Sequence, residues 1–513
     1  MLVAASALIT SACHSRARVP TPDQEAQLAE RVAAILNEAD RAFDEMHLVG
    51  WRKAELLYSE AFELRADDGV HDRLELMRYL VLTREIDEKI LKPDQLKRLE
   101  VFCSEAKTPR QSVLCNSAKT DFRLEGLISD EPPPYSREEW KTLERLRDGS
   151  LSMEYVFLRA MRREFSSVYD AEVGDFLQRD RGSPSSVYLQ ILGGEPVANL
   201  DELLEQNPEF AELWAYRGQC LLGEKHYREA LASLEHSLQL VPDYLPVLEL
   251  LGSTYLYDLQ LPEPALLYYR QALQIFPGEA EAALGRGIAL HYLGRSVESN
   301  EALSSFFSDG IDWTGTRASA RNAYLGRAAY FMAYNYFLRG LASSARFWVD
   351  RALELTPTLE GAHYLSGVLY FGEHDLARAA EELRQVVEPG TTICDAYFKM
   401  GMIAAEDNPA AMDQYFLNNG VCLEQSITGG LERIDEMNEW DLDPSSKATA
   451  LQSGRRELKR TKSQALASVL SMLKTAHGAP VPRRAPLLDA LNRLFERLNA
   501  IPVDESAAAI SPR

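Results

Sequence analysis

Residues 214–242 read WAYRGQCLLGEKHYREALASLEHSLQLVP, and residues 248–277 read LELLGSTYLYDLQLPEPALLYYRQALQIFP. Each stretch places a large apolar residue four positions before a glycine, an alanine about twelve positions after it, and a proline at its end. The glycine lets two helices approach closely, the later alanine packs against the first helix, and the proline ends the second helix. The pattern therefore predicts a unit of two packed helices.

The same unit recurs through the second half of the chain at a nearly constant period. Successive small residues are separated by 34, 35, 46, 34 and 34 positions, and the interval of 46 equals one period plus an insertion of 12. The insertion maps to residues 308–320, SDGIDWTGTRASA, which are rich in turn-forming residue types. The six small residues are Gly218, Gly252, Gly287, Ala333, Gly367 and Gly401.

This unit resembles the tetratricopeptide repeat (TPR), a 34-residue helix–turn–helix with the pattern W-x2-L-G-x2-Y, then A-x3-F, then a closing Pro. The resemblance covers about residues 211–422, and it departs from the pattern at Arg217 and Arg286, where Leu is usual. It implies an all-α, right-handed superhelical solenoid with extra helices at both ends, and a protein that binds other proteins along its concave side. A different array of helical hairpins is the alternative fold.

The rest of the chain divides by composition. Three consecutive prolines cannot lie inside a helix, so residues 129–136 are predicted to be a linker. Apolar residues at helical spacing predict helices on both sides of it, and an array also needs end pieces that cover its last apolar surface. The predicted segments are a lipoprotein-type signal and anchor at 1–13, a polar tether at 14–27, an N-terminal helical (TPR-like) region at 28–128, the linker at 129–136, a helical connecting region at 137–206, the TPR array at 207–424, capping helices at 425–499 and a disordered tail at 500–513.

The first residues are typical of an exported chain. Residues 1–12, MLVAASALITSA, carry no charge and are too few to cross a bilayer, but they fit the apolar part of a secretory signal. Small residues directly precede Cys13, and this stretch resembles a bacterial lipobox, which implies lipidation of Cys13. By resemblance to enteric lipoproteins, His14 favours sorting to the outer membrane. The expected location is the bacterial cell envelope, lipid-anchored and facing the periplasm; the alternatives are an ordinary cleaved signal or a soluble TPR adaptor without a lipid anchor.

Six cysteines are present, and five remain when the first is set aside, so full pairing is excluded. In an exported chain, Cys103 with Cys115 and Cys394 with Cys422 are candidate disulfides, and the alternative is that all five thiols are unpaired. Cys220 is predicted to be a small buried hydrophobe on an apolar helix face. No Cys-x-x-Cys occurs and no Cys/His cluster has zinc spacing, so no metal site is predicted.

The charge balance and the absence of catalytic motifs limit the function. The chain has 77 acidic and 55 basic side chains, a net charge of −22, whereas phosphate binding needs clustered Lys and Arg, so nucleic acid is not predicted as a partner. The sequence contains no His-Glu-x-x-His, Walker A or Gly-x-Ser-x-Gly motif. We therefore predict no enzyme activity, no catalytic residue, no cofactor and no small-molecule substrate. An accessory protein with a pocket in residues 28–205 is the remaining alternative.

The first helices of a TPR array line its concave side. We take the residues three before each small residue, and one, four and five after it, to face that side, and none of them is Lys or Arg. Aromatic rings supply large buried area at low entropic cost, so we predict that this groove binds an apolar or aromatic segment of another envelope protein, as an extended peptide or an amphipathic helix. The alternative is that a C-terminal helix covers the groove. The predicted groove residues are Tyr257, Tyr292, Tyr330, Tyr334, Phe337, Tyr364, Phe371 and Phe398.

Overall fold

The computed structural model describes residues 22–87, 95–104, 106–124, 137–146, 173–177, 183–192, 196–308, 310–311, 313, 316–387, 391–478 and 485–501. Every regular element in these ranges is a helix. The predicted all-α fold is therefore confirmed. The predicted signal and anchor at 1–13, with Cys13, lies outside the described residues, as do the linker at 129–136 and residues 502–513 of the tail.

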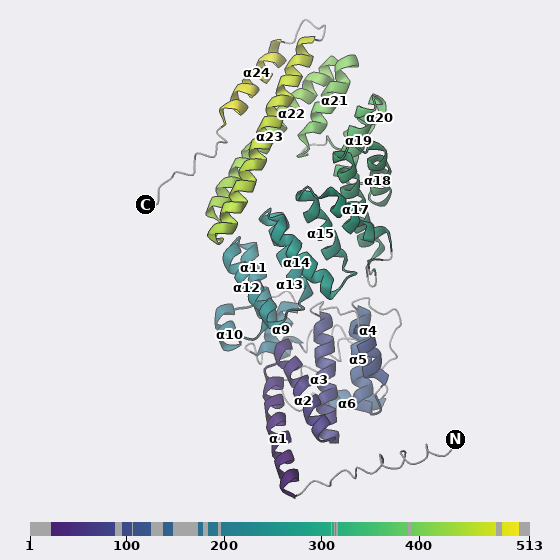
Figure 1. The fold of residues 1–513 in the computed structure, drawn as a ribbon, viewed down its shortest axis with the longest axis vertical. Coiled ribbons are helices and arrows are strands. Elements are labelled where there is room, and N and C mark those ends of the chain that lie inside the picture. Colours follow the sequence, from purple (N-terminus) through teal and green to yellow (C-terminus); the bar gives the residue numbers. More distant parts are fainter. Residues whose placement is uncertain are drawn as a thin grey trace, which may run out of the picture.

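Six helical hairpins, which we call copies one to six, follow one another from α11 to α22 (Figure 1). In five of them the first helix begins seven residues before the small residue of that copy. The first helices are α11 (Ala211–Gly223), α13 (Leu245–Ser253), α15 (Ala280–Tyr292), α17 (Ala318–Leu338), α19 (Glu360–Gly372) and α21 (Cys394–Asp407). The second helices are α12 (Tyr227–Leu240), α14 (Pro262–Ile275), α16 (Ser296–Ser304), α18 (Ala342–Leu355), α20 (Leu376–Arg384) and α22 (Pro409–Glu439).

The small residue of a copy receives a large side chain from the second helix of the same copy. A Cβ atom at Gly218 would lie 2.6 Å from Leu234 Cγ, and one at Gly367 would lie 2.6 Å from Leu383 Cγ. Both leucines are fully buried. The two helices pack this closely because the glycine has no side chain between them. The array is a TPR-like solenoid.

Two departures from the 34-residue period have local causes. Copy two absorbs its extra residue in a π-helical turn at Thr254–Asp258, where Leu259 N–H donates to Thr254 O at 3.0 Å, because a π turn holds one residue more than an α turn. The insertion before copy four is part loop and part helix. The first helix of that copy begins at Ala318, fifteen residues before Ala333, so it is about two turns longer than the others.

The described residues of the N-terminal region and of the connecting region that follows it are also largely helical. The first of them begins at Pro22, so residues 22–27, which the composition assigns to a tether, are helical; this corrects the predicted boundary at 28. The helices are α1 (Pro22–Asp44), α2 (Leu48–Leu64), α3 (Asp68–Asp87), α4 (Gln95–Ser104), α5 (Pro109–Leu124), α6 (Arg137–Leu146), α9 (Pro184–Leu192) and α10 (Leu200–Gln206).

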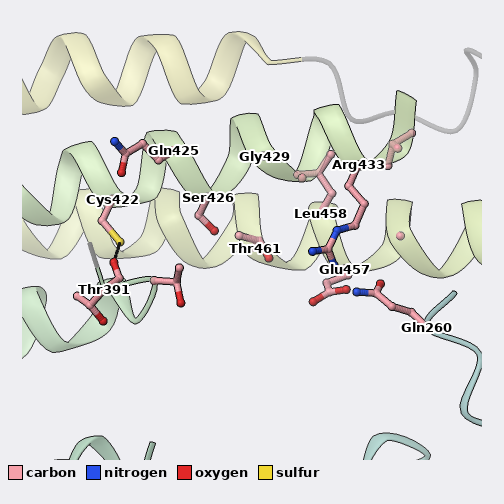
Figure 2. Close-up of a pocket in the computed structure, with 14 residues that line it drawn as sticks. Gln260, Thr391, Cys422, Gln425, Ser426, Gly429, Arg433, Glu457, Leu458 and Thr461 are labelled. Atoms are coloured by element: carbon pink, nitrogen blue, oxygen red, sulfur yellow. Dashed lines mark hydrogen bonds between the residues drawn. The ribbon is translucent and has the colours of Figure 1, made fainter. Parts of the chain in front are cut away.

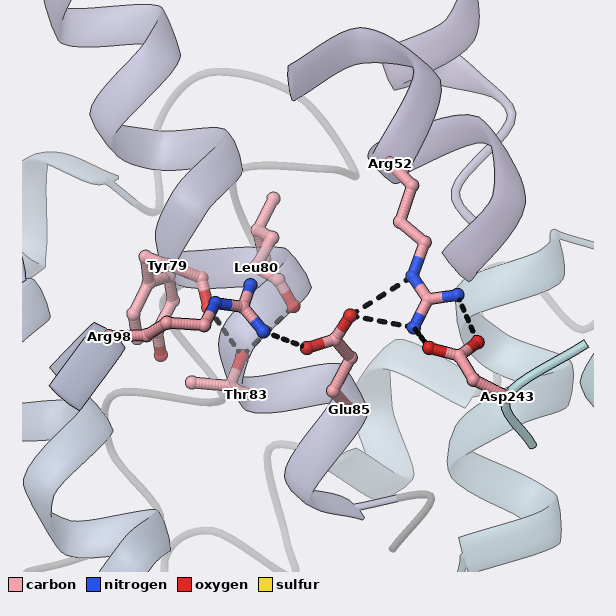
Figure 3. Close-up of polar contacts among 7 residues, drawn as sticks. All are labelled: Arg52, Tyr79, Leu80, Thr83, Glu85, Arg98 and Asp243. Atoms are coloured by element: carbon pink, nitrogen blue, oxygen red, sulfur yellow. Dashed lines mark hydrogen bonds and ion pairs between the residues drawn. The ribbon is translucent and has the colours of Figure 1, made fainter. Parts of the chain in front are cut away.

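The N-terminal region packs directly on copy one through buried polar contacts. The carboxylate of Glu212 on α11 accepts hydrogen bonds from Leu48 N–H at 3.1 Å and from Arg84 Nε at 3.0 Å. The side chains of Arg84 and Glu212 are 0% and 1% exposed. At the edge of the same joint, Arg52 of α2 donates to Asp243, between α12 and α13, at 2.8 Å (Figure 3). The two regions therefore form one continuous core.

The C-terminal helices are longer than an end cap requires. α22 runs without a break from Pro409 to Glu439, so the predicted boundary between array and caps at 424/425 falls inside one helix and is wrong. α23 (Pro444–Gly478) runs alongside α22, and α24 (Ala485–Ala500) packs on both. Their apolar faces cover copy six, as an end cap should.

The last third of α22 and the first half of α23, residues 429–461, return to the start of the array (Figure 1). We call these residues the strap. Its tip contacts α12, where the ring of Trp440 meets the ring of Tyr227 edge-on at 4.9 Å between centroids. Met437 and Leu442 join the same buried cluster as Tyr227. The C-terminal helices therefore connect copy six back to copy one across the array.

Candidate partner-binding site

The eight predicted groove aromatics lie on consecutive first helices, with Tyr257 on the π turn that extends α13. Tyr292 is 61% exposed and Tyr257 is 43% exposed, and the other six rings are half-buried. On α17 the rings follow one another at short range: Tyr334 lies 6.1 Å from Tyr330 and 6.2 Å from Phe337, centroid to centroid. The rings of α15, α17 and α19 therefore form an aromatic stripe along the first helices.

Two basic side chains that the sequence pattern misses also border the aromatic stripe. Arg327 of α17 donates to the hydroxyl of Tyr257 at 3.4 Å, across two copies. Lys399 of α21 lies 5.0 Å from the ring centroid of Phe371. Arg327 lies six positions before Ala333, on the extended helix of copy four, so the usual TPR register does not assign it to this side.

Burial keeps the phenol groups of Tyr257, Tyr292, Tyr330 and Tyr364 protonated at neutral pH. Burial raises the pKa of Tyr330 to about 12, and burial also raises the pKa values of Tyr257 and Tyr292. Burial followed by the charge of Asp395 raises the pKa of Tyr364, whose hydroxyl donates to that carboxylate at 2.7 Å. Protonated phenols can donate hydrogen bonds to peptide carbonyl groups, so the stripe offers polar contacts as well as apolar area.

His291 is part of the stripe but serves packing between copies. Its Nδ1 lies 2.7 Å from Asn335 Oδ1, and Asn335 Nδ2 donates to Ser299 at 2.9 Å. The ring of Tyr334 lies 5.3 Å from the imidazole ring. Burial lowers the pKa of His291, which favours the neutral imidazole. These contacts tie copy three to copy four.

The C-terminal helices cover the aromatic stripe at copy six, and the ring of Tyr292 in copy three stays exposed. Phe398 stacks on Phe416 at 6.2 Å and packs into the C-terminal cluster, and Thr475 of α23 reaches Met402 at 3.3 Å. Copy six is therefore covered by the C-terminal helices, as the alternative of an intramolecular cover predicts. Tyr292 in copy three keeps most of its ring exposed, which the open-groove prediction requires.

A cavity of about 390 Å³ separates the strap from the array (Figure 2). Gln260, from the turn between α13 and α14, lines it together with Thr391, from the segment before α21. Glycines, short polar side chains such as Ser426, and the charged side chains of Arg433 and Glu457 line the opposite wall on α22 and α23. The cavity shows that the middle of the strap is not packed flush against the array.

The structure pairs four of the cysteines. Cys103 bonds to Cys115 with their Cα atoms 5.2 Å apart, and Cys394 bonds to Cys422 with theirs 5.5 Å apart. Cys220 is free and exposed, so the prediction that it is buried is wrong. The apolar neighbours that suggested burial belong to the other faces of α11.

A second cavity, of about 330 Å³, lies in the N-terminal region between α2, α3 and α4. Its basic lining residues are Arg78, Lys97 and Arg98. Arg78 pairs with Glu75 at 2.8 Å, and Arg98 pairs with the buried carboxylate of Glu85 at 2.5 Å (Figure 3). Both arginines thus take part in the ion pairs of this region. Among the described residues, no group of three or more His, Cys, Asp or Glu side chains is arranged to hold a metal ion.

No family model matches the sequence, and no curated protein matches it. Solved structures with similar helical repeats exist. One is PilW, a widely conserved type IV pilus biogenesis factor, at 20% identity over 40% of this chain and 91% of PilW, with a TM-score of 0.34. PilF of Pseudomonas aeruginosa is 16% identical over 45% of this chain and 97% of PilF, with a TM-score of 0.35. A tetratricopeptide repeat protein from Parabacteroides merdae is 16% identical over 58% of this chain and 98% of its own, with a TM-score of 0.34.

Proposed function

We propose that this chain is a non-enzymatic scaffold that binds a segment of a partner protein along the aromatic stripe. The observation that carries the proposal is the row of rings on α15, α17 and α19, with Tyr292 at 61% exposure. Contiguous exposed apolar area on a soluble protein usually marks an interaction site. Tyr and Phe rings supply much of the binding energy at such sites, since they bury large area with few rotatable bonds.

The partner segment is apolar or aromatic, because the rings it meets leave little room for unpaired charge. Its backbone carbonyl groups would accept hydrogen bonds from the phenol hydroxyl groups of Tyr292 and Tyr334. Arg327 adds a cationic donor at the copy-two end of the stripe, beside Tyr257. A strongly acidic chain of net charge −22 would repel acidic segments elsewhere on its surface, which favours a neutral or basic partner.

Loss of three rings from the centre of the stripe should abolish partner binding. A library of random twelve-residue peptides on phage, selected on the full chain, is expected to enrich peptides with two or more aromatic or large aliphatic residues. The combined change Tyr330→Ser, Tyr334→Ser and Phe337→Ser should weaken the selected peptides by about tenfold or more, since several buried contact areas are lost. Fluorescence polarisation with a selected peptide measures the effect.

Phe347→Ser is the matched control, because this ring is 62% exposed on α18, a second helix that faces away from the stripe. Its peptide affinity should equal that of the unchanged chain. Equal binding by the triple variant, with its helical circular dichroism intact, would exclude the stripe as the binding site.

The proposed location is the bacterial cell envelope, with the chain lipid-anchored through Cys13, facing the periplasm and attached to the outer membrane. Its partners there are other envelope proteins. Two disulfides, Cys103–Cys115 and Cys394–Cys422, support an oxidising compartment. No helix in the described part of the chain is long and apolar enough to cross a membrane. A lipid on the N-terminal cysteine would hold such a chain at a membrane surface.

Metabolic labelling tests the anchor. Cells that express the chain and receive radiolabelled palmitate should yield labelled protein in the membrane fraction. Cys13→Ser should remove the label and release the protein to the soluble fraction, because it removes the sulfur that carries the acyl chains. Cys220→Ser, which changes the exposed free cysteine, should keep the label. An unlabelled native chain would favour the soluble adaptor instead.

A further inference from the structure

α22 is fixed to the array before the strap begins and again at the tip of the strap, and a cavity separates the helices from the array in between. At one end, the Cys394–Cys422 disulfide joins α22 to the start of α21. At the other end, Trp440 contacts Tyr227 of α12. Between them lies the cavity of about 390 Å³ that Gln260 and Thr391 line from the array side (Figure 2). We call the first end the root and the contact with α12 the latch.

The latch combines apolar burial with poorly satisfied polar groups. Trp440 is 6% exposed, yet its indole N–H finds no hydrogen-bond acceptor among the described residues. The two ion pairs beside it, Lys225–Glu436 at 3.2 Å and Arg228–Asp441 at 3.6 Å, join side chains that are more than half exposed. Exposed pairs contribute little, and a buried donor without a partner opposes closure. The latch is therefore a contact that can open without disrupting the array.

Two adjacent glycines lie between root and latch. Gly429 and Gly430 are adjacent in the second half of α22. Gly429 lies seven positions after Cys422, and Gly430 lies seven positions before Met437 of the latch. A Cβ atom at Gly429 would meet nothing within 4 Å, so packing does not require a glycine there, whereas one at Gly430 would lie 2.8 Å from Leu458 Cδ1 of α23. Adjacent glycines weaken a helix, and sharp bends in long helices occur at such points.

The strap faces the exposed part of the aromatic stripe. The C-terminal helices contact copy one at the latch and copy six at the root, so the strap spans the copies that carry the stripe. The negative charge of Glu457, on the strap, follows burial among the causes that raise the pKa of Tyr292, in agreement with this placement. Glu457 also lines the cavity beneath the strap (Figure 2). A partner segment that reaches the centre of the stripe must therefore pass the strap.

We propose that the strap is a gate: it bends at Gly429–Gly430 when the latch releases, exposes the aromatic stripe between copies two and five, and closes again over a bound segment. This inference rests on the proposed function for what enters, but the movement of the strap is independent of it. A closed gate keeps the apolar stripe away from unrelated surfaces, and a ligand that binds the open form shifts the population towards it.

Thiol labelling measures the gate without any partner. In the full chain with Cys220→Ser, one cysteine is introduced beneath the strap by Tyr292→Cys or on the outer side of the array by Phe347→Cys. The two native rings are 61% and 62% exposed, so they are matched in exposure. Each variant reacts with N-ethylmaleimide or with a bulky polyethylene-glycol maleimide, and mass spectrometry of the modified peptide gives the rate.

With the latch intact, the bulky reagent should react at least about tenfold more slowly at position 292 than at 347, whereas the small reagent reacts similarly at both. Adding Trp440→Ala should bring the bulky reagent's rate at 292 close to that at 347.

Glu436→Lys, which repels Lys225 and leaves Trp440 in place, should raise the bulky reagent's rate at 292 less than Trp440→Ala does. Gly429→Ala should lower it, because a stiffer helix opens less often. Leu417→Ala, exposed on α22 before the hinge, should change nothing.

Equal rates of the bulky reagent at 292 and 347 with the latch intact would overturn the gate, as would a Trp440→Ala variant that keeps native circular dichroism and the slow rate. If Trp440→Ala loses its fold, Glu436→Lys and Gly429→Ala decide the question by their opposite effects. Because no partner takes part, failure of the gate leaves peptide binding to the stripe untouched, and failure of the peptide selection leaves the gate untouched.

Discussion

Replacing Glu212 with alanine is expected to lower the free energy of unfolding by about 3–5 kcal/mol, because it removes the carboxylate that faces the buried Arg84. Both side chains are essentially inaccessible, at 1% and 0% exposure. The variant also removes the acceptor of Leu48 N–H at the start of α2. Because the guanidinium group of Arg84 is inaccessible, hydration by water cannot compensate for the loss of its counter-ion. Urea unfolding followed by circular dichroism measures the loss.

Two variants separate this effect from the loss of any Arg–Glu pair. Glu60→Ala removes the exposed pair with Arg31, at 2.9 Å between helices α1 and α2, and should cost no more than about 1 kcal/mol. The double change Arg84→Met and Glu212→Leu removes both charges and should recover most of the stability, since apolar residues of similar size often replace a buried pair without loss. If Glu212→Ala cost as little as Glu60→Ala, the joint would not depend on this pair.

The sequence predicts the array well because its repeats are short-range and redundant. The small residue of each copy marks the point where its two helices pack together. The packing of Gly218 against Leu234 in copy one recurs as the packing of Gly367 against Leu383 in copy five. A copy that departs from the pattern is still recognised, because the adjacent copies fix the period on both sides of it. The insertion before copy four is recognised from the longer interval between small residues, but the pattern does not predict how much of the insertion is helical. For this reason the sequence does not predict the contact of Arg327 with Tyr257.

Contacts between distant parts of the chain are not visible in the pattern. Arg84 and Glu212 have the composition of surface charges, and only the meeting of α3 with α11 buries them. Met437 and Trp440 read as residues of an end cap, but the length of α22 and α23 brings them to Tyr227, more than two hundred positions earlier. Burial decided by such encounters depends on the whole fold, and no local periodicity encodes it.

The second large effect is expected at Gly285, where a change to valine should lower the free energy of unfolding by about 3 kcal/mol. A side chain here would collide with the ring of Tyr269, which comes from the second helix of copy two and is fully buried. The same ring also lies against Gly252, where a Cβ atom would be 2.7 Å from Cε1. Tyr269 thus occupies space on two successive first helices, and both must be glycine at the contact. Thermal and urea unfolding measure the loss.

Only copy three has a glycine two positions before its small residue, because only there does the ring of Tyr269 reach the next first helix. At the place of Tyr269, copies one, three and five carry Leu234, Leu303 and Leu383, which are shorter and pack against the glycine of their own hairpin. Adding Tyr269→Leu to Gly285→Val should therefore restore much of the stability, because it clears the space that the valine needs. Gly429→Val, at an open helical position, should change stability by about 0.5 kcal/mol or less. Equal stability of the two valine variants, or no rescue by the leucine, would show that the Tyr269 ring can move aside and that Gly285 is not needed for packing.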